Sequence, residues 1–209
     1  MTIKTAFSEL KNKHPKFHSH LKGINNGKWI EIGVWHAKNA KYVLDNLDIE
    51  KIYLIDPYMP LDYAERFFGT HELQDENERI AREKLAEYEE KCVWIKKTSE
   101  NASDLFDDNS VDVVYVDGNH SYEHVLSDCE KYWEKIKPGG LLMGDDINES
   151  GVKEGVRDFL IGELKKQKAR GAPGNPSIEV HILHSQFPEL FYVVKPQVET
   201  TLVIDQSVL

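Results

Sequence analysis

The chain has little of what marks a secreted, disulfide-stabilised or membrane-spanning protein. Its 209 residues include two cysteines, Cys92 and Cys129, which show neither CxxC nor zinc-ligand spacing. Such isolated cysteines are typical of reduced thiols, so we expect a cytoplasmic protein. No stretch approaches the roughly 20 consecutive apolar residues of a membrane span. The N-terminal segment lacks the apolar core of a signal peptide.

Basic residues are also in the minority. The chain has 26 Lys and Arg residues against 36 Asp and Glu residues, which gives a formal net charge of -10. Binding to nucleic acid or to an acidic membrane surface draws on clustered Lys and Arg. We therefore expect neither partner. The length suits a single domain that spans residues 1–209.

What the chain does have is an alternation of strand-like and helix-like segments. Short apolar runs rich in β-branched residues are separated by longer amphipathic segments. This alternation predicts an α/β fold with a doubly wound, mainly parallel seven-stranded sheet. The last two predicted strands, 178–183 and 190–194, form a terminal antiparallel hairpin. The other predicted strands include 28–32, 51–55, 92–95, 111–116 and 141–144.

Two segments depart from this pattern. Residues 1–25 are expected to form an N-terminal helical segment. Its histidines are interpreted as solvated surface residues rather than metal ligands. Residues 57–91 exceed what a crossover helix needs, so we expect a lid over the site or a contact in a homodimer. The aromatic residues of this segment could line an acceptor pocket, form the lid core or form a dimer face: Tyr58, Tyr63, Phe67 and Phe68.

The most informative stretch runs from Val111 to Asn148. A buried strand ends at Asp117, and the following strand ends at Asp145 and Asp146. The carboxyl ends of neighbouring parallel strands meet at one edge of the sheet, so these carboxylates are expected to converge. Oxygen ligands of this kind suit Mg²⁺ or another divalent cation. The alternative is that Asp117 caps a helix and the other two are turn residues.

His120 lies in the turn directly after Asp117. Because the unperturbed pKa of histidine is close to neutrality, His120 is a candidate general base. It could equally support the metal ligands or be a further ligand. His120, His124 and Asp128 also follow an i, i+4, i+8 spacing that imitates a metal site on a helix. We favour the simpler interpretation, in which these side chains point outward.

A second candidate site follows the first predicted parallel strand. Gly33 permits a tight turn and a close approach of the backbone to a ligand. A dinucleotide-binding turn has further glycines, but here Trp35 and Ala37 stand in their places. This disfavours NAD or FAD and is compatible with a cofactor that lacks phosphates. Asp56 ends the next strand, about 20 residues on, where an acidic residue binds ribose hydroxyls; a helix cap is the alternative.

With these motifs, residues 29–196 resemble the class I S-adenosylmethionine (SAM)-dependent methyltransferases, which have a Rossmann-like fold. The Asp-Gly-x-His-x-Tyr turn that begins at Asp117 is similar to that of small-molecule O-methyltransferases. The resemblance implies that the turn with Glu31, Gly33 and Trp35 binds the methionine end of SAM. It implies that Asp56 binds the ribose and that Ser99 lies at the adenine, with Asp117 also beside the cofactor.

The resemblance extends to the metal-dependent sugar and catechol O-methyltransferases. It implies that Asp117, Asp145 and Asp146 bind Mg²⁺ or another divalent cation, and that Asp117 and His120 are the catalytic residues. A bound cation orients the acceptor hydroxyl and lowers its pKa. The expected acceptor is a small hydroxylated molecule, such as a sugar or a catechol. Two alternatives remain open: a non-haem metal oxygenase that uses His120 with the acids, and a non-catalytic cofactor-binding module.

Overall fold

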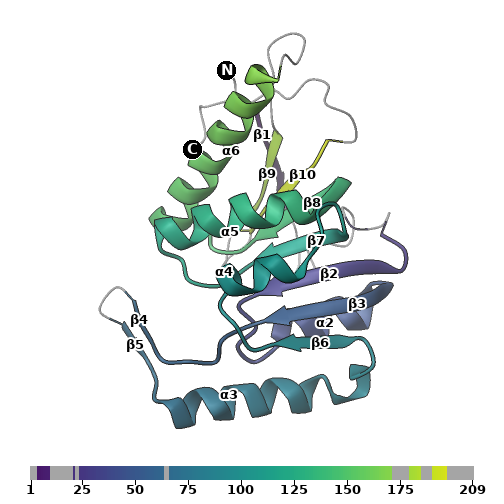
Figure 1. Ribbon diagram of the computed structural model, residues 1–209, viewed down its shortest axis with the longest axis vertical. Coiled ribbons are helices and arrows are strands. Elements are labelled where there is room, and N and C mark those ends of the chain that lie inside the picture. The colour runs from purple at the N-terminus through teal and green to yellow at the C-terminus, as the bar shows by residue number, and fades with distance from the viewer. Residues whose placement is uncertain are drawn as a thin grey trace.

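The computed structural model describes residues 4–9, 21, 24–63, 66–170, 179–184 and 190–196. An eight-stranded sheet forms the centre of the molecule (Figure 1). The strand order across this sheet is β6-β3-β2-β7-β8-β10-β9-β1. The strands are β1 (Lys4–Glu9), β2 (Gly27–Ile32), β3 (Ile49–Ile55), β6 (Cys92–Ile95), β7 (Val111–Val116), β8 (Ile136–Gly144), β9 (Glu179–His184) and β10 (Leu190–Val194).

Helices cover both faces of the sheet, because its strands are apolar on both sides. In β7, Val114 and Val116 belong to one buried apolar cluster, whereas Val113 and Tyr115 belong to the other. This alternation follows from the two-residue period of a strand. The first cluster contains residues of α4 (Ser99–Ala102), α5 (Tyr122–Lys135) and α6 (Ser150–Ala169). The second contains residues of α2 (Lys38–Asn46) and α3 (His71–Lys84).

The fold class is the predicted one. Strands β6, β3, β2, β7 and β8 pair in parallel, and β10 is antiparallel to both β8 and β9. These strands form the predicted seven-stranded sheet with its terminal antiparallel hairpin. Among the described residues, no helix has the length and apolar character needed to cross a bilayer.

The N-terminal segment differs from the prediction. Residues 4–9 form strand β1, which pairs in parallel with β9 as an eighth strand at the edge of the sheet. The predicted helical segment over residues 1–25 is therefore wrong at these positions. Backbone pairing with a distant strand outweighs the weak helical pattern of a short segment. The histidines of the same segment, His14, His18 and His20, lie outside the described residues.

The predicted insertion over residues 57–91 contains two parts. Strands β4 (Leu61–Tyr63) and β5 (Arg66–Phe68) form a separate antiparallel hairpin, and α3 follows. Figure 1 shows the hairpin projecting away from the central sheet, on the side of the carboxyl ends of the parallel strands. A lid or dimer role for this segment stays a prediction.

The junction between α5 and β8 is tighter than the sequence predicts. The sequence predicts a strand over 141–144, whereas α5 ends at Lys135 and β8 begins at Ile136, so Pro138, Gly139 and Gly140 lie within the strand. The backbone of this segment is held instead by Lys195: the Gly139 amide donates to the Lys195 carbonyl at 2.7 Å, and the Lys195 amide donates to Gly140 at 2.8 Å. This extra pairing extends the strand through the glycines.

Candidate active site

The candidate site lies along the carboxyl edge of the parallel strands. The strands β2, β3, β6, β7 and β8 run in the same direction, so their carboxyl ends meet at one edge. The residues singled out in the sequence follow these ends: Gly33, Asp56, Ser99, Asp117 and the pair Asp145 and Asp146. Their common edge is where ligands bind in open α/β sheets.

The turns after β2 and β7 touch each other at Gly33. Gly33 has a φ of +82°, which residues with a side chain rarely adopt. A Cβ atom at this position would collide with the carbonyl group of Asp117. Glycine is therefore required here on two grounds, and the predicted cofactor turn lies directly beside the predicted catalytic turn.

Two side chains, those of Asp56 and Tyr58, hold the remainder of this turn in an unusual conformation. Trp35 and Ala37 have φ values of 45° and 51°, in the left-handed region. One carboxylate oxygen of Asp56 accepts hydrogen bonds from the amides of Val34 and Trp35, both at 2.9 Å. The Tyr58 hydroxyl donates to the Trp35 carbonyl at 3.0 Å. These bonds offset a left-handed conformation that costs about 1–2 kcal/mol for an ordinary residue.

Asp56 therefore has a role that the sequence did not reveal, namely to support the cofactor turn. It is not the helix cap considered as an alternative: its other oxygen accepts from the Tyr58 amide, at 2.8 Å, in a segment that forms no helix. Ribose binding by Asp56 stays a prediction. The side chain of Trp35 is 59% exposed and stacks on the His36 ring, with ring centroids 4.4 Å apart.

Glu31 is buried at the carboxyl end of β2, with 1% of its surface exposed. The Asn39 side-chain amide donates a hydrogen bond to it at 2.9 Å. Burial is the largest cause that raises the pKa of Glu31 to about 8. A buried carboxyl group beside the Gly33 turn suits a ligand that brings a positive charge, because the cation would compensate the buried anion.

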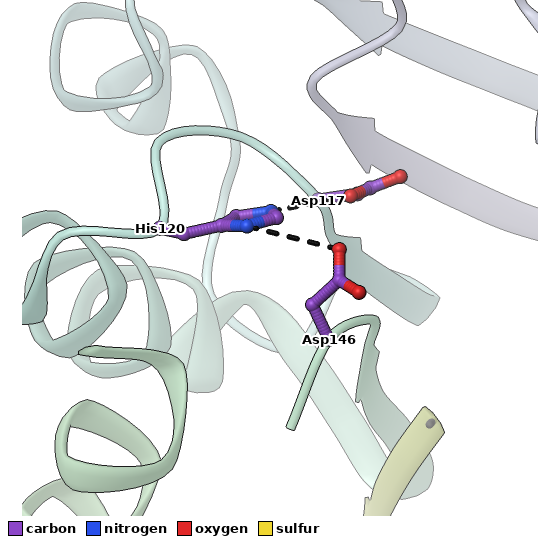
Figure 2. Close-up of side chains that lie close together, drawn as sticks. All are labelled: Asp117, His120 and Asp146. Atoms are coloured by element: carbon purple, nitrogen blue, oxygen red, sulfur yellow. Dashed lines mark ion pairs between the residues drawn. The ribbon is translucent and has the colours of Figure 1, made fainter. Parts of the chain in front are cut away.

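The turns after β7 and β8 together form a cluster of charged side chains. Figure 2 shows the His120 ring facing both carboxylates, with dashed lines from its two nitrogens to Asp117 and Asp146. The ligand atoms of these three residues, here called the acid–histidine cluster, all lie within 4.8 Å of one another. Nε2 of His120 is 3.5 Å from Asp117, and Nδ1 is 3.7 Å from Asp146 and 3.2 Å from Glu149.

Asp145 lies outside this cluster, although the sequence grouped it with Asp117 and Asp146. Its carboxylate accepts a hydrogen bond from the Tyr115 hydroxyl at 3.2 Å and another from the Asp146 amide at 2.8 Å. Asp146 has a φ of 52°, in the left-handed region. The structure thus brings together two of the three predicted acids, and His120 completes the group.

Asp117 and His120 each shift the pKa of the other. Burial raises the pKa of Asp117. The hydrogen bond to Asp117 is the largest cause that raises the pKa of His120 to about 9, so its ring is protonated at neutral pH. Two carboxylates and an imidazole are also a donor set that fits a divalent cation, which would replace that proton. Carboxylates suit both Mg²⁺ and Mn²⁺, and an imidazole nitrogen suits a transition metal, so this mixed set is compatible with Mn²⁺.

The spacing of His120, His124 and Asp128 does not define a metal site. Helix α5 begins at Tyr122, so His120 precedes it. His124 is exposed, as the preferred interpretation expects, but Asp128 is 3% exposed and that interpretation is wrong for it. The residue that sequence reasoning missed is Glu149. It directly precedes the first turn of α6, and a polar residue there is too common to serve as a signal.

Comparison with known proteins agrees with this geometry. A family model described as a methyltransferase domain matches residues 30–147, which is more than half of the chain. The chain belongs to this methyltransferase family. The match begins within β2 and ends just after Asp145 and Asp146, so it spans both candidate turns. The predicted class, a class I SAM-dependent methyltransferase, is thereby confirmed.

Individual relatives of this methyltransferase are distant. An uncharacterised protein, R132, of Acanthamoeba polyphaga mimivirus is 23% identical over 149 residues, which are 67% of this chain and 64% of the viral protein. The O-methyltransferase TomG from Streptomyces achromogenes, in complex with SAM and involved in tomaymycin synthesis, superposes with a TM-score of 0.59 at 12% identity. That match covers 86% of this chain and 78% of TomG.

A second structure, the SAM-dependent O-methyltransferase TM0748 from Thermotoga maritima, has a TM-score of 0.57 at 14% identity. The match covers 90% of this chain and 67% of that protein. Identities this low establish a shared fold and nothing finer. The comparisons therefore establish the family and the fold, whereas a proposal for the methyl acceptor rests on the residues of the site.

Proposed function

We propose that this methyltransferase transfers the methyl group of SAM to a hydroxyl oxygen of a small acceptor, at a site that holds a divalent cation. The observation that carries the proposal is the acid–histidine cluster. Its members Asp117, His120 and Asp146 lie within 4.8 Å of one another. The carbonyl group of Asp117 also packs against Gly33 in the cofactor turn. A methyl donor on that turn and an acceptor on the cluster would be neighbours.

The residues proposed to bind SAM follow the same edge of the sheet. Glu31 offers a buried carboxyl group to the positively charged methionine end, and the neighbouring Gly33–Trp35 turn is proposed to bind the same end of SAM. Asp56 is proposed to bind the ribose with lone pairs that its hydrogen bonds to the turn leave free. Ser99, at the start of α4, is proposed to contact the adenine.

The reaction is a displacement in which a bond forms between the acceptor oxygen and the methyl carbon while the carbon–sulfur bond breaks. A divalent cation, when bound, would orient the acceptor hydroxyl and lower its pKa. Asp117 and Asp146 would hold that cation. His120 would hold it too or accept the hydroxyl proton, which requires the neutral imidazole. The products are S-adenosylhomocysteine and a methyl ether. Holding the two reactants side by side supplies much of the acceleration.

The oxygenase alternative has less support from this geometry. Non-haem iron oxygenases use two histidines and one carboxylate, whereas the cluster offers one histidine and two carboxylates. His124, the next histidine along the chain, is exposed on α5.

The first test is calorimetric titration of SAM, and separately of Mn²⁺ and Mg²⁺, into protein freed of metal with EDTA. We expect SAM to bind without metal, and Mn²⁺ to bind more tightly than Mg²⁺. An Asp146→Asn variant should bind Mn²⁺ at least about tenfold more weakly. Asp107→Asn, at an exposed position on the loop before β7, is the matched control.

Two results would count against the proposal. If SAM does not bind to the folded protein, SAM is not the methyl donor. If the wild type and Asp146→Asn bind Mn²⁺ with equal affinity, the acid–histidine cluster is not the metal site. The acceptor class is then tested by measuring S-adenosylhomocysteine formation with sugars and catechols, with Mn²⁺ present and with EDTA.

A further inference from the structure

Helix α3 contacts the cofactor turn at His36, a residue that the proposed reaction does not use. The His36 ring stacks on the exposed indole of Trp35, with the two ring planes 15° apart. Its Nε2 atom lies 2.8 Å from Oδ1 of Asn77, in the middle of α3. The Lys84 ammonium, in the last turn of the same helix, donates a hydrogen bond to the His36 carbonyl at 2.5 Å. Helix α3 thus holds both the ring and the backbone of His36.

The direction of the bond between His36 and Asn77 follows from the other contact of Asn77. Asn77 is a buried polar side chain, 6% exposed, and buried polar groups need hydrogen-bond partners. Its Nδ2 atom donates to Oε1 of Gln74 at 3.2 Å, so its oxygen is the atom that faces His36. A carbonyl oxygen only accepts, and Nε2 of His36 therefore carries the hydrogen and donates it.

This bond lies at the strained part of the cofactor turn. Trp35 and Ala37, on either side of His36, both have a left-handed backbone. Such conformations persist only where the surrounding contacts hold them. Asp56 and Tyr58 hold the backbone at Trp35, and α3 holds it at the next residue, His36. The conformation of the turn therefore depends on α3 as well as on the segment that follows β3.

We propose that Asn77 is a positioning residue for SAM binding: through the His36 ring it keeps the Gly33–Trp35 turn in the conformation that receives the methionine end of SAM. A turn that is already ordered binds its ligand more tightly, because binding then carries no ordering cost. The segment over residues 57–91, expected to be a lid or a dimer contact, thus also supports the cofactor site. The inference rests on the proposed function, because SAM is assigned to this turn there.

The test measures the dissociation constant of S-adenosylhomocysteine by calorimetry, without metal, together with the stability of each variant in urea. Asn77→Leu removes the acceptor with little change in side-chain size and should weaken binding by about fivefold to thirtyfold, the usual effect of one lost buried hydrogen bond. Asn77→Asp keeps an oxygen that accepts from His36 and should retain most of the affinity. Asp75→Leu, at an exposed position on the same helix, is the matched control and should bind as the wild type does.

His36→Phe tests the same contact from the turn, and it keeps an aromatic ring on which Trp35 can stack. It should weaken binding as much as Asn77→Leu does, and the double variant should bind no more weakly than either single variant, because both changes remove one hydrogen bond.

Two results would overturn the inference. One is that the losses in the double variant add. The other is that the folded single variants bind with wild-type affinity while only their stability falls, which is what a purely structural role of Asn77 predicts. If Asn77→Leu does not fold, His36→Phe and Asn77→Asp decide between the same outcomes. Absence of binding to the folded wild type would instead overturn the proposed function, and the inference with it.

Discussion

Gly33 is the residue at which the turn after β2 touches the turn after β7. Its positive φ and the carbonyl group of Asp117 next to it leave no room for a side chain. Gly33→Ala should therefore lower the free energy of unfolding by about 2–3 kcal/mol, from backbone strain together with displacement of the Asp117 turn. It should also abolish calorimetric binding of S-adenosylhomocysteine.

The control for this substitution is Gly162→Ala. Gly162 lies in α6 with nothing within 4 Å of an added Cβ. Alanine there should raise the free energy of unfolding by about 0.5–1 kcal/mol, because glycine disfavours a helix interior. Urea denaturation measures both variants. A Gly33→Ala protein as stable as the wild type would contradict the packing described here.

At this site the sequence predicts which residue types are present more easily than it predicts where their side chains point. The acidic residues after two neighbouring strands suffice to predict a cluster that contains Asp117 and Asp146. Asp145 lies outside the cluster, where its carboxylate accepts a hydrogen bond from the Tyr115 hydroxyl of the adjacent strand, and Asp146 next to it has a left-handed backbone. Neither is visible in a sequence, because φ is not encoded by an aspartate and strand register is set by the whole sheet.

Helix α5 ends with a cap that comes from a distant part of the chain. The Lys195 ammonium donates to the carbonyl groups of Trp133 at 2.8 Å and of Ile136 at 2.7 Å. A cation at a helix C-terminus satisfies the last carbonyl groups and compensates the helix dipole. This contact joins the segment after β10 to the helix that follows the His120 turn.

Removing this cap should destabilise the protein without changing the chemistry of the site. We expect Lys195→Met to lower the free energy of unfolding by about 1–3 kcal/mol, since it leaves partly buried carbonyl groups unpaired. Lys153→Met, an exposed position on α6, should change it by less than about 0.5 kcal/mol. Urea denaturation of the two variants measures this difference in the free energy of unfolding. Equal denaturation midpoints for Lys195→Met and Lys153→Met would contradict a capping role of Lys195.

At the level of elements, the sequence predicts those strands and helices whose pattern is local. Strands β2, β3, β6 and β7 are short segments in which apolar residues predominate, and they were predicted within a few residues. Strand β1 was not predicted, because its only reason to be extended is the pairing with β9. The β4–β5 hairpin was missed for a related reason: each strand has three residues, too few to show a period.

For the whole molecule, several buried groups share one direction of pKa shift. The pKa is raised to about 8 for Glu31, about 7 for Asp145, about 6 for Asp128 and about 9 for His120. Burial is the main cause for the three acids, and the neighbouring Asp117 is the main cause for His120. Between pH 5 and 9 the folded protein therefore binds more protons than the unfolded chain.

This difference in bound protons predicts that the free energy of unfolding falls as the pH rises from 5 to 9. Each acid is penalised once the pH passes its unfolded pKa, and the His120 contribution is lost as the pH approaches 9. The slope is at most about 1.4 kcal/mol per pH unit for each proton. Urea denaturation in EDTA at each pH measures it.

Glu31→Gln isolates one of these protons. Its amide oxygen can still accept a hydrogen bond from Asn39, but the amide does not titrate. The slope of the free energy of unfolding against pH, between pH 5 and 8, should therefore be smaller by the contribution of about one proton. Glu130→Gln, at an exposed position, should follow the wild type. Superimposable curves for Glu31→Gln and the wild type would show that Glu31 is ionised throughout this range.

The pairing of β1 with β9 has a consequence for synthesis. The first strand of the chain, Lys4–Glu9, finds its partner in Glu179–His184. On the ribosome, β1 emerges long before β9 is made, whereas β2, β3, β6 and β7 can pair with one another as they appear. The edge of the sheet is thus completed last, and for most of translation a chaperone could bind β1 as an unpaired strand.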